Sequence, residues 1–168
     1  MEIPAVLPPR IRTATMADLP VIQRLIKQLA TYERAPEQAR ATADQLQRAL
    51  FGDQPAVYAL VAEGHAGEPV GFAVWYLSFS TWEGTHGIYL EDLFVSESER
   101  GGGLGRALLT ALAMIARHNG YRRVEWAVLN WNAPAIGFYR ALGATSQDEW
   151  TVNRLQGDAL AALAGFPR

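Results

Sequence analysis

The chain has 168 residues, of which 49% are hydrophobic and 19% are charged, and its net charge is -2. This composition predicts a globular fold with a substantial core and argues against disorder. The charge provides no basic surface for nucleic acid or anionic lipid, so we expect a small, cationic partner and no nucleic acid. No cysteine is present, which excludes disulfides, thiolate metal sites and a cysteine nucleophile.

Residues 1–9 contain three prolines and are expected to form a flexible arm before a single domain over residues 10–168. They have neither a basic region nor a long apolar stretch, and no later segment approaches the length of a membrane span. We therefore expect a cytoplasmic protein that does not contact a membrane.

The first third of the chain is predicted to form a strand followed by two helices. A short strand is expected at residues 11–13, and Thr15 to Asp18 has the spacing of a capping box. Apolar residues then recur at helical period to about Tyr32. A second capping signature over residues 42–45 predicts a shorter helix that ends at Gly52.

The remaining elements alternate between strands and helices. Expected strands cover residues 57–62, 70–79, 88–95, 124–129 and 150–155, and the first two should form a hairpin. Helices are expected from Leu104 to about Asn119 and over residues 136–142, with Pro134 near the start of the second. This order predicts an α/β fold with a mixed central sheet and helices on both faces.

A glycine-rich turn separates the strand at 88–95 from the following helix. It reads Arg100-Gly101-Gly102-Gly103-Leu104-Gly105-Arg106. Glycine permits positive φ and close approach of a ligand, and the amides that open the next helix attract anions. The spacing fits neither a P-loop nor the dinucleotide fingerprint. A plain flexible connection is the structural alternative, but the two flanking arginines favour a pyrophosphate.

Together, these residues and five further segments resemble the GNAT acetyltransferase superfamily, and within it the diamine (spermidine/spermine) and thialysine N-acetyltransferases. The further segments are Ile11–Thr15, Leu29–Glu33, Ser80–Trp82, Tyr89–Val95 and Asn130–Tyr139. The resemblance implies acetyl-CoA as co-substrate, no metal, and a homodimer. The sequence departs from the family pattern at residues 96–99, which are Ser-Glu-Ser-Glu before Arg100.

The resemblance also implies roles for individual residues. The backbone of Leu93, Phe94 and Val95 would bind pantetheine and the acetyl carbonyl, and residues 100–106 would hold the pyrophosphate. Asn132 and Tyr139 would complete the cofactor site, with Tyr139 as the general acid that protonates the leaving thiolate. The structural alternative for Tyr139 is a core aromatic beside Phe138.

An alkylammonium must lose a proton before it attacks an acyl carbon, which requires a route to a base. Glu91 is the candidate, through water. The alternative for both Glu91 and Asp92 is a structural role, in which they pair with nearby arginines or cap a neighbouring loop. Because neighbouring strand residues face opposite sides, we expect only one of these two acids to face the acceptor directly.

Several separated carboxylates would best hold a flexible cationic acceptor. The candidates are Glu33 beside Tyr32, Glu91, Asp92, and Glu149 beside Trp150. The alternative to a substrate-binding role for Glu33 and Glu149 is that they are ordinary surface charges. Trp82 is a candidate to stack on an ammonium group, or else packs on the core. The three histidines are scattered without metal spacing.

The leading functional hypothesis is acetyl transfer to a primary amine of a diamine, polyamine or thialysine-like amino acid. Two alternatives stay open at this level. In the first, the acceptor is an antibiotic amine or a protein amine. In the second, the chain is a non-catalytic acyl-CoA-binding module.

Overall fold

The computed structural model describes residues 1–165, which divide after Ala127 into two compact units. The first unit holds a five-stranded mixed sheet in the order β1-β2-β3-β4-β5. Its strands are β1 (Ile11–Thr13), β2 (Tyr58–Glu63), β3 (Pro69–Ser80), β4 (Thr85–Val95) and β5 (Val124–Glu125). The first four pair antiparallel, and β5 runs parallel to β4. The predicted hairpin of β2 and β3 is confirmed.

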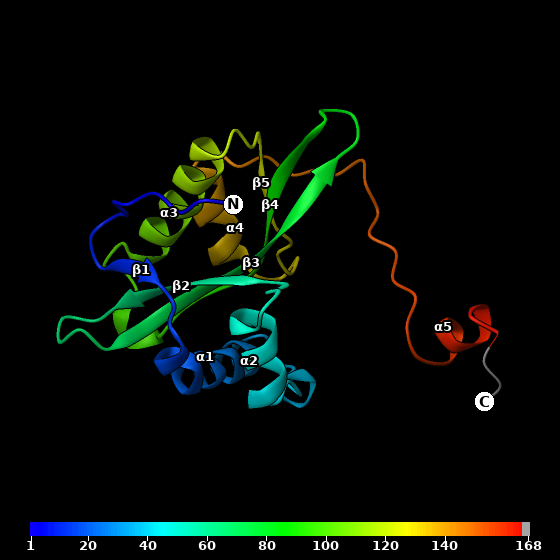
Figure 1. The fold of residues 1–168 in the computed structure, drawn as a ribbon, viewed down its shortest axis with the longest axis horizontal. Helices are drawn as coiled ribbons and strands as arrows, with labels where there is room; N and C mark the ends of the chain where they lie inside the picture. The colour runs from blue at the N-terminus through cyan, green and yellow to red at the C-terminus, as the bar shows by residue number, and fades with distance from the viewer. Residues whose placement is uncertain (166–168) are drawn as a thin grey trace. The chain divides into compact units, whose positions relative to one another are not determined.

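Three helices cover this sheet: α1 (Leu19–Tyr32), α2 (Ala43–Phe51) and α3 (Leu104–His118). The first two lie on one face and α3 lies on the other (Figure 1). The predicted α/β class, with helices on both faces of a mixed sheet, is therefore confirmed. Short 3-10 helices at Met16–Asp18, Pro36–Gln38 and Glu97–Glu99 connect these elements.

Asp18 ties the start of α1 to β1. Its carboxylate accepts hydrogen bonds from the backbone N–H and the hydroxyl of Thr15, at 2.7 and 2.9 Å. Two guanidinium nitrogens of Arg12 donate to the same carboxylate at 2.7 and 2.9 Å. These donors lower the pKa of Asp18 to about 2, with the Arg12 hydrogen bonds as the largest cause. The predicted capping position thus fixes where α1 begins.

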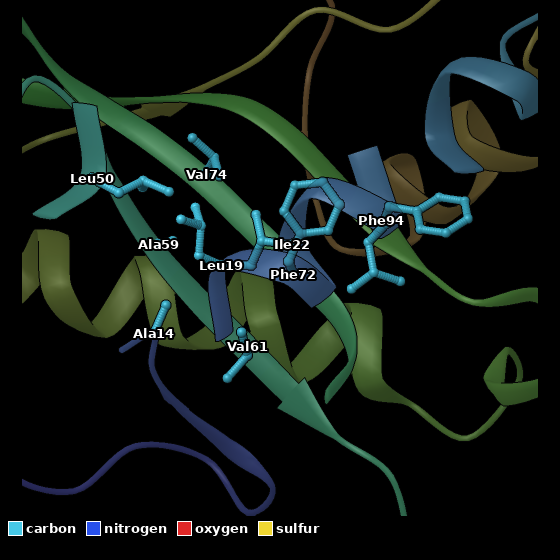
Figure 2. Close-up of a cluster of buried hydrophobic side chains, with 10 residues drawn as sticks. Ala14, Leu19, Ile22, Leu50, Ala59, Val61, Phe72, Val74 and Phe94 are labelled. Atoms are coloured by element: carbon cyan, nitrogen blue, oxygen red, sulfur yellow. The ribbon is translucent and has the colours of Figure 1, made fainter. Parts of the chain in front are cut away.

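The core on the α1 and α2 face is apolar and continuous. Phe72 and Val74 of β3 and Phe94 of β4 belong to one buried cluster with Leu19 and Ile22 of α1 (Figure 2). On the opposite face, Leu108, Leu112 and Ile115 of α3 are completely buried, at the helical spacing expected from the sequence. Both faces of the sheet are therefore covered, and polar side chains on them need a specific reason.

The second unit contains α4 (Ala133–Ala141) and α5 (Gly157–Leu163). The predicted helix after Pro134 is confirmed, whereas the strand expected at residues 150–155 is wrong. Within residues 1–165 the sheet takes no strand from beyond Glu125, so this segment has no ladder partner, and Val152 is 84% exposed. The strand expected over residues 124–129 shrinks to the two residues of β5, and α5 was not anticipated.

The residues expected to form a flexible arm make defined contacts at their first positions. The backbone N–H of Glu2 donates to Asn119 Oδ1 at 2.7 Å, and Asn119 Nδ2 donates back to the Glu2 carbonyl at 2.7 Å. Asn119 follows the last residue of α3. The flexibility of residues 1–9 and the single domain over residues 10–168 stay predictions.

Candidate active site

The glycine turn between β4 and α3 has the geometry of an anion cradle. Gly101 and Gly103 have φ values of 82° and 83°, which only glycine adopts without strain, and open space lies where a β-carbon would stand. Gly103 is the N-cap of α3 and supplies no side-chain cap, and the first turn carries no acid. The opening amides of α3 are therefore available to an anion.

One edge of β4 is left without a strand partner beside this cradle. β4 pairs with β3 along its length, but β5 pairs with it only at Ile88 and Tyr89. Among the described strands, none pairs with residues 90–95 on the β5 side. Leu93, Phe94 and Val95, the expected cofactor contacts, lie in this stretch. Their backbone can pair with an extended ligand that carries amide groups, as a peptide pairs with a sheet edge.

The side chain of Arg100 is turned toward α1. Its guanidinium carbon lies 4.7 Å from the ring centre of Tyr32 and 5.3 Å from that of Phe94. Nε donates a hydrogen bond of 3.0 Å to the Val95 carbonyl. Arg106, the other flanking arginine, is exposed in the first turn of α3. The two arginines expected together at the glycine turn therefore have different surroundings.

A β-bulge on β4 places Glu91. Asp92 stands opposite Val74 and Leu90 stands opposite Trp75, so Glu91 is the extra residue between two aligned pairs. Asp92 shares the α1 and α2 face with its cross-strand partner Val74, which belongs to the buried cluster there. Glu91 is exposed. The bulge removes the strict alternation on which the sequence argument about these two acids relied.

Three carboxylates form an acidic cluster: Glu33, Glu91 and Asp92. Burial raises the pKa of Asp92 to about 6, with smaller contributions from the charges of Glu91 and Glu33. Burial also raises the pKa of Glu33, which caps the C-terminus of α1. In the described part of the chain, none of the three forms an ion pair. Uncompensated carboxylates beside one another attract a cation.

Two tyrosines that the sequence argument missed adjoin this cluster. Tyr76 and Tyr89 are cross-strand partners on β3 and β4, and their rings stack with centroids 5.1 Å apart. Burial raises the pKa of Tyr76, and Glu91 and then Tyr89 add to the rise. The sequence showed only an aromatic-rich strand pair, and their common location depends on the strand register.

Four further candidates lie elsewhere. Trp82 is 89% exposed in the turn between β3 and β4, so packing on the core, its alternative role, is wrong.

Asn132 is the N-cap of α4, where its Oδ1 accepts a 3.3 Å hydrogen bond from the Ala135 N–H. Tyr139 lies on α4 with its ring tilted against Phe138, 5.2 Å between centroids. Glu149 is exposed in the irregular segment before Trp150. The last three belong to the second unit.

Neither a metal site nor a membrane span emerges from the described residues. No group of three or more His, Cys, Asp or Glu side chains in residues 1–165 is arranged to hold a metal ion. Over the same residues, every helix is too short or too polar to cross a bilayer.

Comparison with known proteins agrees with this geometry. The profile of the Acetyltransferase (GNAT) family matches residues 22–144. A thialysine N-epsilon-acetyltransferase of Bos taurus is 39% identical over 92% of this chain and 96% of its own. An L-ornithine N5-acetyltransferase of Arabidopsis thaliana is 33% identical over 92% of this chain and 87% of its own.

Solved structures show the same fold. An integron cassette protein from the mobile metagenome of V. cholerae superposes with a TM-score of 0.75 at 29% identity, covering 92% of this chain and 96% of that one. The resemblance inferred from the glycine turn and the flanking segments is confirmed, and the chain is an N-acetyltransferase that belongs to the GNAT family.

Proposed function

We propose that the protein transfers the acetyl group of acetyl-CoA to the primary amine of a small cationic acceptor, by direct attack while both substrates are bound. The acceptor class is a diamine, a polyamine or an amino acid with a terminal amine, such as thialysine. The acidic cluster of Glu33, Glu91 and Asp92 carries this proposal, because three carboxylates without cationic partners suit an acceptor with more than one positive charge. The names of the bovine and Arabidopsis relatives, which refer to thialysine and ornithine, support it.

The residues around the glycine turn fit acetyl-CoA. The turn and the first amides of α3 would hold the pyrophosphate, and the free edge of β4 at residues 93–95 would pair with the amides of pantetheine. When bound, the co-substrate supplies an acetyl group activated as a thioester. A backbone N–H at this edge would orient and polarise the acetyl carbonyl.

Glu91 would provide the route by which the acceptor loses its proton. A primary alkylammonium has a pKa of about 10, so the neutral amine is scarce near neutral pH. The bulge holds Glu91 exposed on β4, beside the edge where the acetyl group would lie. From there its carboxylate would accept the proton through an ordered water.

Tyr139 would supply a proton to the departing thiolate, and Asn132 would order the chain at the start of α4. We expect Tyr139→Phe to lower kcat about 100-fold while changing the Kd for acetyl-CoA less than threefold, because only the proton donor is lost. Tyr121→Phe, which removes a hydroxyl from the first unit, is the matched control. An unchanged kcat in Tyr139→Phe would remove this residue from the mechanism.

A coenzyme A release assay tests the function directly. The acceptor panel is putrescine, spermidine, thialysine, ornithine, lysine, an aminoglycoside and a peptide. We expect acceleration above the hydrolytic background with the small amines and none with the peptide. Faster release with the peptide or the aminoglycoside would redirect the acceptor assignment, and no acceleration by any amine would contradict the catalytic proposal.

A further inference from the structure

A pocket of about 650 Å³ lies between α1 and the connection from β4 to α3. From α1 it is lined by residues 24, 27, 28, 31 and 32, which follow the i, i+3, i+4, i+7, i+8 pattern of one helix face. This face is distinct from the apolar stripe of Leu19, Ile22 and Leu25 that packs on the sheet. The connection contributes Ser96, Ser98 and Arg100.

The lining of this pocket carries more positive than negative charge. Arg24, Lys27 and Arg100 all line it, and in the part of the chain that the structure describes none of the three forms an ion pair. Glu97 is the one acid in the lining, and it too is without an ion pair among residues 1–165. We call Arg24, Lys27, Arg100, Ser96 and Ser98 the cationic pocket.

The position of the cationic pocket limits which ligands can occupy it. Arg100 directly precedes Gly101, so the pocket adjoins the cradle formed by the glycine turn and the start of α3. The Arg100 guanidinium is held over Tyr32 and anchored to the Val95 carbonyl, which directs it to the pocket. A ligand that reaches both sites would carry two anionic groups, one for each.

We propose that the cationic pocket binds the ribose 3′-phosphate of coenzyme A, while the glycine turn holds the pyrophosphate. This assignment rests on the proposed use of acetyl-CoA. A phosphate monoester carries close to two negative charges and three acceptor oxygens, which matches two or three cations with neighbouring serine hydroxyls better than a single carboxylate would. The ribose joins this phosphate to the pyrophosphate, so one molecule carries both anions.

Acetyl-dephospho-CoA, which lacks only the 3′-phosphate, tests the assignment. With a saturating amine, we expect wild-type kcat/KM to be at least tenfold higher for acetyl-CoA than for acetyl-dephospho-CoA. Lys27→Gln and Arg24→Gln should each reduce this preference at least threefold. With acetyl-dephospho-CoA, both variants should match wild type within twofold, because the group they contact is absent. Lys27→Arg should keep the preference, since it keeps the charge.

Arg117→Gln is the matched control, because Arg117 is an exposed cation in the last turn of α3 and does not line the pocket. Equal wild-type use of the two cofactors would overturn the assignment, as would variants that lose activity equally with both. If the variants instead raise KM for ornithine but not for putrescine, the pocket binds the acceptor's carboxylate and the proposal is wrong.

Calorimetric titration with coenzyme A and dephospho-CoA separates this proposal from the proposed reaction. A wild-type preference for coenzyme A that Lys27→Gln abolishes would support the pocket even if no amine on the panel is acetylated. Equal binding of the two ligands would overturn the pocket assignment while leaving the transferase proposal intact.

Discussion

The cationic pocket and the acidic cluster have opposite charge, and α1 contributes to both: Arg24 and Lys27 line the pocket, and Glu33, the C-cap of α1, belongs to the cluster. Lys27 and Glu33 are six residues apart, which corresponds to about 9 Å along a helix axis. In neither region do the charged groups form ion pairs with one another or with other residues of the described chain. The two groups of unpaired charge fit the two ligands proposed above, an anionic end of the cofactor and a cationic acceptor.

The aromatic ring of Tyr32 lies between these two regions in the sequence of α1, with Arg100 over its face. We infer that α1 and its C-cap help to separate the two substrates: the anionic end of the cofactor binds near Arg24 and Lys27, and the cationic acceptor binds near Glu33 and its neighbour Asp92 of β4. Variants that alter one region should leave the affinity for the other ligand unchanged.

The largest effect is expected at the acidic cluster, in Glu91→Gln. We expect kcat/KM for the amine to fall about 100- to 1,000-fold, because the variant lacks a proton acceptor while keeping the size of the side chain. The Kd for coenzyme A should change less than twofold. The pH–rate profile is the decisive measurement: a flattened profile indicates proton handling, whereas a higher KM with an unchanged profile indicates acceptor binding alone. Glu83→Gln, an exposed acid in the β3–β4 turn, is the control.

Asp92→Asn should increase stability at neutral pH. The folded-state pKa of Asp92 is about 6 and its unfolded value is about 3.9, so the native state favours the neutral form. Below about pH 4, Asp92 is protonated in both the folded and the unfolded state, so its ionisation does not change the free energy of unfolding. As the pH rises from about 4 to above 6, wild type loses up to about 3 kcal/mol of unfolding free energy that the amide variant keeps. Urea unfolding at pH 4, 5, 6 and 7 measures this, and a difference that does not vary with pH would contradict it.

Glu33→Gln and Lys27→Gln form a crossed pair on α1. Glu33→Gln should raise KM for a diamine about fivefold to tenfold, an effect of about 1 kcal/mol for one partly buried charge, without changing the affinity for coenzyme A. Lys27→Gln should weaken coenzyme A binding without changing KM for the diamine. Parallel changes in both constants in both variants would indicate a general distortion of α1 instead of two separate sites.

Trp82→Ala is expected to have the smallest effect. The side chain is 89% exposed, so the free energy of unfolding should change by less than about 0.5 kcal/mol. If the indole stacks on the acceptor's ammonium group, KM for the amine should rise about twofold to threefold. An unchanged KM would remove Trp82 from the substrate-binding residues, and a large loss of stability would contradict its exposed position.

Local patterns in the sequence were sufficient for most of the fold. Capping residues at Thr15 and Thr42, apolar period along α1 and α3, and glycines with positive φ each act over a few residues, so they can be read without knowing the tertiary structure. The GNAT resemblance rests on the same kind of local signal. The strand expected at 150–155 failed because a strand requires a partner, and an apolar pattern does not supply one.

The tertiary structure decided how the charged and aromatic residues are grouped. The bulge at Glu91 depends on the alignment of β3 with β4, which brings Tyr76 to Tyr89 and turns Asp92 toward α1. The cationic pocket joins residues of α1 to residues more than sixty positions later in the chain. Sequence spacing determines which residues share a helix face or a turn, whereas only the packing of α1 against β4 determines which charges meet without a partner.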